Sequence, residues 1–477
     1  MRESNVITAT TQVGSYLDSF TEFEKRAAGH NQPWLRALRQ DAFALFCATG
    51  FPTTHDEDWR FTNVAKIAQT EFQLPQDGTS NISVEDVAPY RLPGSSCQLV
   101  FVNGHFAPQL SELGSLPNGV VVASLADELA NNARRLEPHL GRYLNLQRDA
   151  FCALNTAYLQ DGAYIRIPRG TVLEAPVYLL FVSTASDTPT MTHPRNLIVA
   201  EEDTQATIVE DYVSLTAGKT ARGAIFSNAV TELVAGDNSV LSHYMIEREH
   251  TGAFNISTLR TQQGRSSVVS SHSILLGGGL VRNNVHPVLN GEGADCLING
   301  LFIGNGHQHM DNYMLVEHAS PHCSSRQFYN GILDGQSRGV FHGRIIVHKD
   351  AQKTDAKQTN RNLLLSDSAQ IDTKPQLEIY ADDVRCTHGA TIGQIEEDAL
   401  FYLRSRGMNE ASARRLLLFA FANECLDRMK PGTLRERIES LILETLFHES
   451  GSGGSPTVDT ANVKVSETSG RNWEEVG

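Results

Sequence analysis

The sequence predicts an all-β core built as a parallel β-helix, with α-helical segments on both sides of it. Two observations on residues 161–393 predict this fold. The chain there consists of short runs rich in β-branched and apolar residues, such as Val177–Val182 and Asn196–Ala200. Polar corners separate the runs, and they recur at about 27 to 34 residues at first and at about 15 to 17 later. This period is typical of a solenoid with two strand-bearing faces, in which each coil buries apolar residues on its neighbours.

A large β-sandwich is the alternative fold. It would need hairpin turns about every 8 to 12 residues. Asn-Gly pairs, which favour such turns, do occur, but most of them recur at similar places in the repeat. That recurrence favours coil corners and therefore the β-helix.

Before the core, residues 1–160 are predicted to form a mostly helical domain. Pro33 suits the first turn of a helix, apolar residues follow at helical spacing, and Gly50 ends the pattern. The stretch after that helix is mixed, and it includes a short expected strand at 99–102.

After the core, residues 394–448 are predicted to be helical. Asn409 is placed to cap one helix, and Thr433 begins a capping box for another. Residues 449–477 are rich in Ser, Gly, Thr and acidic residues and have few apolar anchors, so we expect a disordered tail there.

The composition narrows the classes of function. A net charge of −15 argues against non-specific binding to nucleic acid or to an anionic membrane. No apolar run approaches the roughly 20 residues that span a bilayer, and the first residues lack the pattern of a signal or transit peptide. The chain has 7 cysteines and no Cys-x-x-Cys motif, which fits reduced thiols in the cytoplasm.

Cys386 and His388 are the most informative pair of residues. They follow alternating β-prone residues, so a strand would place both side chains on one face. Sulfur with imidazole suits iron, zinc, copper or sulfur transfer. Two ligands do not complete a metal site, so further ligands would be needed, for example from a second chain.

Histidines are most concentrated around residue 310. Alternation in a strand would place His307, His309 and Asp311 on one face, which is a weaker candidate for a metal site. Polar residues stacked in a solenoid also satisfy one another, and that structural role is the favoured interpretation.

The glycine-rich segments 277–279 and 291–293 do not have the spacing of a P-loop or of a dinucleotide-binding turn. They are interpreted as tight corners. We therefore expect this chain to bind no ATP.

Several segments resemble the SufB/SufD family of the SUF iron–sulfur cluster assembly machinery, over about residues 140 to 430. Within that family, Lys374–Thr391 and Glu57–Thr62 are similar to SufD-type members rather than to SufB-type members. The matching segments are Asp161–Pro168, Leu280–Asn284, Leu289–Ala294, Leu297–Leu301, Gly331–Gly335, Asp350–Thr354, Asn362–Leu365, Lys374–Thr391 and Leu400–Gly407.

The resemblance implies a right-handed parallel β-helix and a non-catalytic scaffold subunit that pairs with SufB through the β-helix. It also implies that iron, or a transient iron–sulfur cluster shared with SufB, is handled at that interface. His388 matches the functional histidine of the family, and Cys386 is the accompanying candidate. Reduced flavin is linked to such assemblies, but the sequence shows no flavin motif.

The family further implies that the SufC ATPase binds the C-terminal helices. An apolar stretch there is too long to lie wholly in the core of a small helical segment, so part of it is expected to dock SufC as a helix in a groove. The residues of this stretch are Leu416, Leu417, Phe419 and Phe421.

Two other classes of protein compete with this interpretation. A β-helix lyase or hydrolase acting on carbohydrate would need paired carboxylates on one exposed face and is normally secreted. A left-handed β-helix acyltransferase would show tandem six-residue repeats, which the sequence does not contain.

Overall fold

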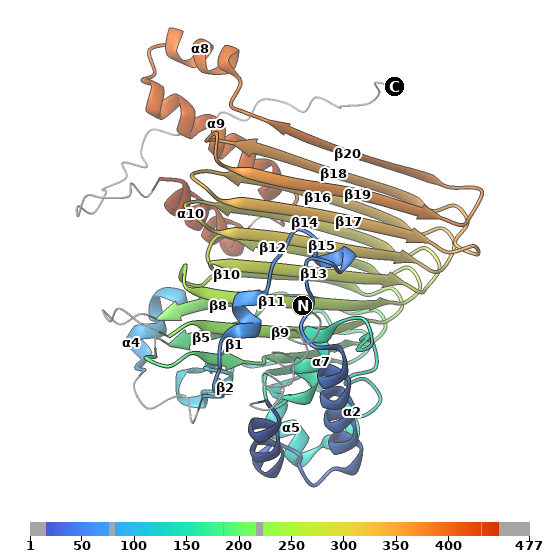
Figure 1. Ribbon diagram of the computed structural model, residues 1–477. Helices are drawn as coiled ribbons and strands as arrows, with labels where there is room; N and C mark the ends of the chain where they lie inside the picture. The colour runs from blue at the N-terminus through green and yellow to red at the C-terminus, as the bar shows by residue number, and fades with distance from the viewer. Residues whose placement is uncertain (1–15, 76–81, 185, 216–222, 431, 448–477) are drawn as a thin grey trace.

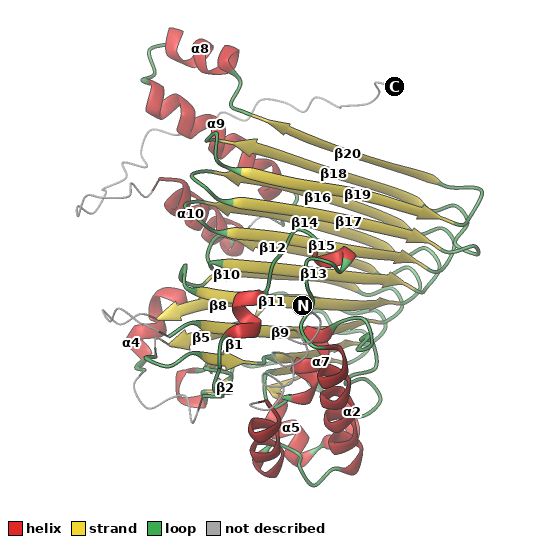
Figure 2. Cartoon of the chain, in the orientation of Figure 1, coloured by secondary structure: helices red, strands yellow, loops and turns green. Residues whose placement is uncertain are grey.

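The computed structural model describes residues 16–75, 82–184, 186–215, 223–430 and 432–447. Its core is the predicted parallel β-solenoid, in which the chain alternates between two facing sheets (Figures 1 and 2). The predicted tail at 449–477 lies outside the described residues.

The first sheet, called sheet 1 here, has 10 strands and ends at β20. Apart from the short β2, neighbouring strands in it are parallel. In spatial order its strands are β2 (His105–Phe106), β1 (Cys97–Val102), β5 (Val177–Thr184), β8 (Gln205–Leu215), β10 (Val240–Arg248), β12 (Val268–Leu275), β14 (Asp295–Gly304), β16 (Ser324–Leu333), β18 (Asp355–Leu364) and β20 (Arg385–Gly393).

The second sheet, sheet 2, faces the first and ends at β19. In spatial order its strands are β19 (Gln370–Ile379), β17 (Arg338–Val347), β15 (His309–His318), β13 (Leu280–Leu289), β11 (Ala253–Gln263), β9 (Ile225–Ala235), β7 (Arg195–Ala200), β4 (Ala163–Ile167) and β3 (Val121–Ser124), with β6 (Thr190–Thr192) pairing beside them on β9.

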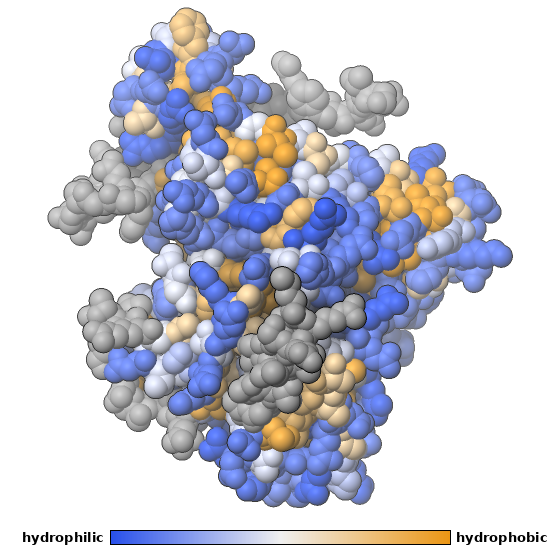
Figure 3. All heavy atoms as spheres, in the orientation of Figure 1, coloured by the Kyte–Doolittle hydropathy of each residue, from blue (hydrophilic) through white to orange (hydrophobic). Residues whose placement is uncertain are grey.

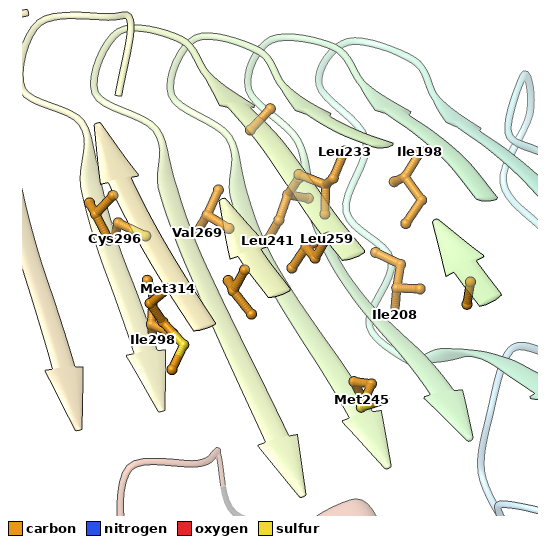
Figure 4. Close-up of a cluster of buried hydrophobic side chains, with 14 of the residues drawn as sticks. Ile198, Ile208, Leu233, Leu241, Met245, Leu259, Val269, Cys296, Ile298 and Met314 are labelled. Carbon is orange, nitrogen blue, oxygen red and sulfur yellow. The ribbon is translucent and has the colours of Figure 1, made fainter. Parts of the chain in front are cut away.

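The main core lies between the two sheets. Alternate residues of each strand point inward, and aliphatic side chains such as Ile208, Leu241 and Leu259 meet there (Figure 4). The predicted corners make the connections: Asp203 and Asn238 adopt the left-handed backbone conformation, with φ of 58° at each, which these residue types tolerate in turns.

At the N-terminal end, helices and antiparallel strands cover the solenoid. β3 runs antiparallel to β4, and β2 runs antiparallel to β1. Pro33 lies in the first turn of helix α2, which spans Pro33–Thr49, and Gly50 caps the end of this helix, as predicted. The other elements here are η1 (Glu57–Trp59), α3 (Ala65–Gln69), α4 (Val84–Val87), η2 (Ala88–Tyr90), η3 (Pro108–Leu110), α5 (Leu125–Asn131), α6 (Ala133–Leu136) and α7 (Ala150–Ala157). The expected strand at 99–102 lies within β1, so part of the segment before residue 161 joins the sheets.

Three helices follow the solenoid: α8 (Glu397–Ser405), α9 (Glu410–Leu426) and α10 (Thr433–Phe447). The Asn409 side chain accepts a hydrogen bond from the Ser412 amide, which is the predicted cap of α9. α9 packs on the outer face of sheet 1. The side chains of Asn299 on β14 and Asn330 on β16 donate hydrogen bonds to backbone carbonyls of this helix. Figure 1 shows α8 standing beyond β20, away from the sheets.

Candidate functional site at the C-terminal end of the solenoid

The C-terminal end of the solenoid differs from the N-terminal end because nothing in the described part of the chain covers it. β20 pairs only with β18, and β19 pairs only with β17. Apolar side chains are exposed there: Ile379 is 40% exposed, Tyr380 62% and Ile392 52%. Figure 3 shows apolar residues, in orange, on the surface over these last strands.

Cys386 and His388 lie on β20, at this uncovered end. In the parallel register Cys386 is opposite Ala356 and His388 is opposite Gln358. Both of those neighbours are buried inside the solenoid, so the two side chains also point toward its interior. The strand thus brings the two residues to one face, as the sequence pattern predicts. Because no further coil of the described chain covers β20, Cys386 is half-buried and His388 is exposed.

The Cys386 thiol is the less accessible of the two groups. Cys386 contacts the main core, and partial burial raises the pKa of its thiol. A raised thiol pKa favours the protonated form, and a bound metal ion would reverse this preference because the thiolate is the ligand. Within the described residues no group of three or more His, Cys, Asp and Glu side chains could hold a metal ion. Any metal at Cys386 and His388 therefore needs ligands from elsewhere.

The surface beneath the pair is polar. Gln358 lies next to His388 in the same inward column. Its Nε2 donates a hydrogen bond to Gln327 Oε1 at 3.2 Å. Gln358 Oε1 and Gln327 Nε2 are buried and have no partner. Buried and unused hydrogen-bonding capacity thus lies directly beneath the exposed imidazole.

The second histidine group occupies the outer face of sheet 2 and the corner before it. His307 is exposed in the turn before β15. Asp311 forms an ion pair with Arg282 at 2.5 Å and accepts a hydrogen bond from Thr62 Oγ1, which also contacts His309 Nε2 at 2.9 Å. Desolvation lowers the pKa of His309. Among the described residues, no group of three His, Cys, Asp or Glu side chains here could hold a metal ion, and these contacts favour the structural interpretation of His307, His309 and Asp311.

The apolar residues expected to dock SufC are divided between two faces of α9. Leu416 is 39% exposed, whereas Leu417 and Phe419 are half-buried. Phe421 is buried on the solenoid, and its carbonyl accepts a hydrogen bond from Asn330.

Sequence reasoning missed two exposed aromatic residues on α8. Phe401 is 73% exposed and Tyr402 is 56% exposed. Their signal is the continuous apolar run 400–403, which cannot face one side of a helix. A second missed signal is that Ile379 and Tyr380 end the last repeat, so no later coil covers them.

None of the helices among the described residues is long and apolar enough to span a bilayer.

Comparisons with known proteins cover nearly the whole chain. Residues 181–421 match the family model described as "SUF system FeS cluster assembly, SufBD core domain", and residues 10–179 match the one described as "SufBD protein N-terminal region". The chain is 34% identical over 436 residues to an iron–sulfur cluster assembly SufBD family protein of Synechocystis sp., covering 91% of this chain and 95% of that protein. It is 32% identical over 400 residues to the iron–sulfur cluster assembly protein SufD of Escherichia coli, covering 83% and 90%. It is 25% identical over 434 residues to SufD of Bacillus subtilis, covering 90% and 96%.

Proposed function

The chain belongs to the SufBD family of the SUF iron–sulfur cluster assembly system, and we propose that it serves there as a SufD-type scaffold subunit without catalytic activity of its own. The observation that carries the proposal is the uncovered end of the solenoid, where Cys386 and His388 share one face of an edge strand. A carbohydrate-active enzyme, the alternative from sequence, finds no support in the relatives.

The proposed partner at this end is SufB. Long edge strands with free backbone groups and exposed apolar side chains are sites where another chain adds strands. Strands of 10 and 9 residues, β19 and β20, offer two such edges side by side. A partner that also ends in an open β-solenoid would pair with both edges at once and would bury Ile379, Tyr380 and Ile392.

The proposed cargo of the interface is iron or a nascent iron–sulfur cluster. His388 supplies an exposed imidazole, and Cys386 supplies a thiol two residues away on the same face. SufB would supply the remaining ligands, because the described part of this chain brings no third ligand to the pair. All 7 cysteines are free, which supports a reducing compartment, and we assign the assembly to the cytoplasm.

The proposed second partner is the ATPase SufC, which would bind ATP in place of this chain. Its docking surface would be the outward side of α8 and α9. There Phe401, Tyr402 and Leu416 form the exposed apolar surface that a groove on another protein recognises. Because Phe421 is buried against the solenoid, it would hold α9 in place rather than contact SufC.

Co-expression with SufB and SufC tests the proposal. We expect His388→Ala to leave the purified complex assembled while lowering its iron content and its cluster absorbance, because an exposed edge residue contributes little to folding. His348→Ala is the matched control, since it removes another exposed histidine of the solenoid, and its loading should equal that of the unaltered complex. Unchanged loading in His388→Ala would remove this residue from the mechanism.

A further inference from the structure

A second candidate site lies on the outer face of sheet 2, far along the chain from Cys386. The segment Glu57–Thr62 crosses that face (Figure 1), and its residues contact three different strands. Glu57 pairs with Lys374 of β19, Trp59 stacks on Arg282 of β13, and Thr62 donates to Asp311 of β15. The proposed function leaves this segment without a role.

The segment closes one side of a cavity of about 230 Å³. The floor is formed by strands β11, β13, β15 and β17, and the opposite wall by residues 144–152, which lead into α7. Arg282, on the floor strand β13, is held in place by its neighbours. Its guanidinium lies 3.8 Å from the centre of the Trp59 ring and 4.9 Å from that of Tyr313, and it pairs with Asp311. The cavity is therefore a built feature of packed side chains.

The cavity is rich in cationic donors. Four arginines and three carboxylates line it, and two carboxylates outside the lining pair with two of the arginines. Arg282 and Arg344 have close carboxylate partners, Asp311 and Glu378, at 2.5 and 2.7 Å. The other two arginines are less well paired. Arg260 reaches Glu317 only at 3.4 Å through Nη2, and its Nε is buried without a partner. Arg148 is exposed at the rim.

The carboxylates of the lining are already engaged. Asp149 accepts bonds from the Cys152 amide and thiol at the start of α7. Glu317 faces Arg260 and also His348, at 3.6 Å. Asp58 is hydrogen-bonded to the Tyr313 hydroxyl. Each carboxylate of the lining thus already has a partner within the fold, whereas Arg260 Nε has none.

His286 adds a further free group on the floor. Its Nε2 is buried and has no partner, and its pKa is lowered to about 3, chiefly by desolvation and further by Arg260 and Arg282. The imidazole is therefore neutral at pH 7, and the tautomer that carries its proton on Nε2 can donate a hydrogen bond into the cavity. Burying cationic and polar donors without acceptors is costly, so this arrangement favours a bound group with several acceptor oxygens.

We propose that this cavity binds a small oxyanion carrying two or more negatively charged oxygens, either a polycarboxylate or a phosphate. Arg148 would meet the anion at the rim, and Arg260 Nε and His286 Nε2 would donate to it from the floor. The volume suits a small molecule, because sites for larger ligands are typically about 300 Å³ or more. The inference does not depend on pairing at the open end of the solenoid.

Calorimetric titration of the full chain with citrate and, separately, with inorganic phosphate tests this site. We expect saturable binding of one molecule per chain for at least one of them, and which one binds tells the two sources of the anion apart. Arg148→Gln should weaken that binding roughly tenfold, the typical effect of losing one charge-assisted hydrogen bond. Arg260→Gln should weaken it at least as much.

Arg134→Gln is the matched control, because Arg134 is an exposed arginine on α6 that does not line the cavity. Its binding should equal that of the unaltered chain. The proposal is overturned if neither anion binds saturably, if the control loses as much affinity as Arg148→Gln, or if both cavity variants bind as the unaltered chain does. Arg148 is at the rim and makes no side-chain bond that folding needs, so its result stands even if Arg260→Gln unfolds.

Discussion

The two ends of the solenoid are built from the same kind of coil but finished differently. At the N-terminal end, β2 and β3 run antiparallel to their neighbours and helices cover the first coil. Ile165 and Leu179 are therefore fully buried. At the C-terminal end the inward columns of the last coil also contain aliphatic residues, yet Leu377 is only half-buried and Ile392 is exposed.

The difference separates an end that is capped within the chain from an end that leaves a surface open to a partner. A terminal coil needs a cap, because the inner face of a solenoid strand is apolar. The N-terminal end carries its cap within the same chain. The C-terminal end exposes that inner face together with two free strand edges, which is a surface suited to a partner. Cys386 and His388 lie on this second end, where a partner could complete their surroundings.

A matched pair of leucines tests the comparison with the largest expected effect. Leu179→Ala removes a fully buried inward side chain at the covered end, and we expect the free energy of unfolding to fall by about 2 to 5 kcal/mol. Leu377→Ala removes a half-buried inward side chain at the open end, and the expected loss is about 1 kcal/mol. Urea denaturation of the isolated chain measures both. Equal losses would show that the two ends are covered alike.

The covered end should also respond to pH. His193 is buried against Tyr158, and desolvation lowers its pKa from 6.5 to about 3. The unfolded chain takes up a proton at this residue below pH 6.5 and the folded chain does not, so stability is lost as the pH falls through that range. Between pH 7 and 5 the loss is up to about 2 kcal/mol.

Comparing urea denaturation at pH 7 and pH 5 for the unaltered chain and for His193→Gln isolates this contribution. The variant should lose less stability on acidification, because glutamine can accept the Asn228 hydrogen bond without titrating. The same loss in both proteins would mean that His193 is not the group responsible.

Much of this arrangement follows from the sequence, and the rest depends on contacts between distant segments. Alternation in 374–391 predicts that Cys386 and His388 share a face, and the regular corners predict the solenoid, because both are local patterns. The burial of Phe421 and the exposure of Phe401 depend on where the helices pack, which helical spacing alone does not decide.

The N-terminal cap is another feature that local patterns do not predict. The strand expected at 99–102 is visible as an apolar run, but its pairing with β5 joins residues about 80 positions apart. The crossing of sheet 2 by Glu57–Thr62 likewise joins Thr62 to Asp311, 249 residues away. Such pairings depend on the whole fold, so local sequence patterns do not show which end of the solenoid is covered and which is open.

The most direct test concerns pairing with SufB at the open end, and it uses a variant that leaves the stability of the isolated chain almost unchanged. Ile379→Lys with Ile392→Lys puts one charge on each free edge, at residues that are already exposed, so folding should be unaffected within about 0.5 kcal/mol. The control is Val172→Lys with Val268→Lys, which alters two comparably exposed aliphatic residues away from β19 and β20.

The measurement is a titration of each double variant with SufB, followed by gel filtration. The edge variant should bind SufB roughly tenfold or more weakly than the unaltered chain, because charged edges oppose strand pairing. The control should bind as the unaltered chain does. Undiminished binding by the edge variant would contradict the claim that this open end is where the partner joins.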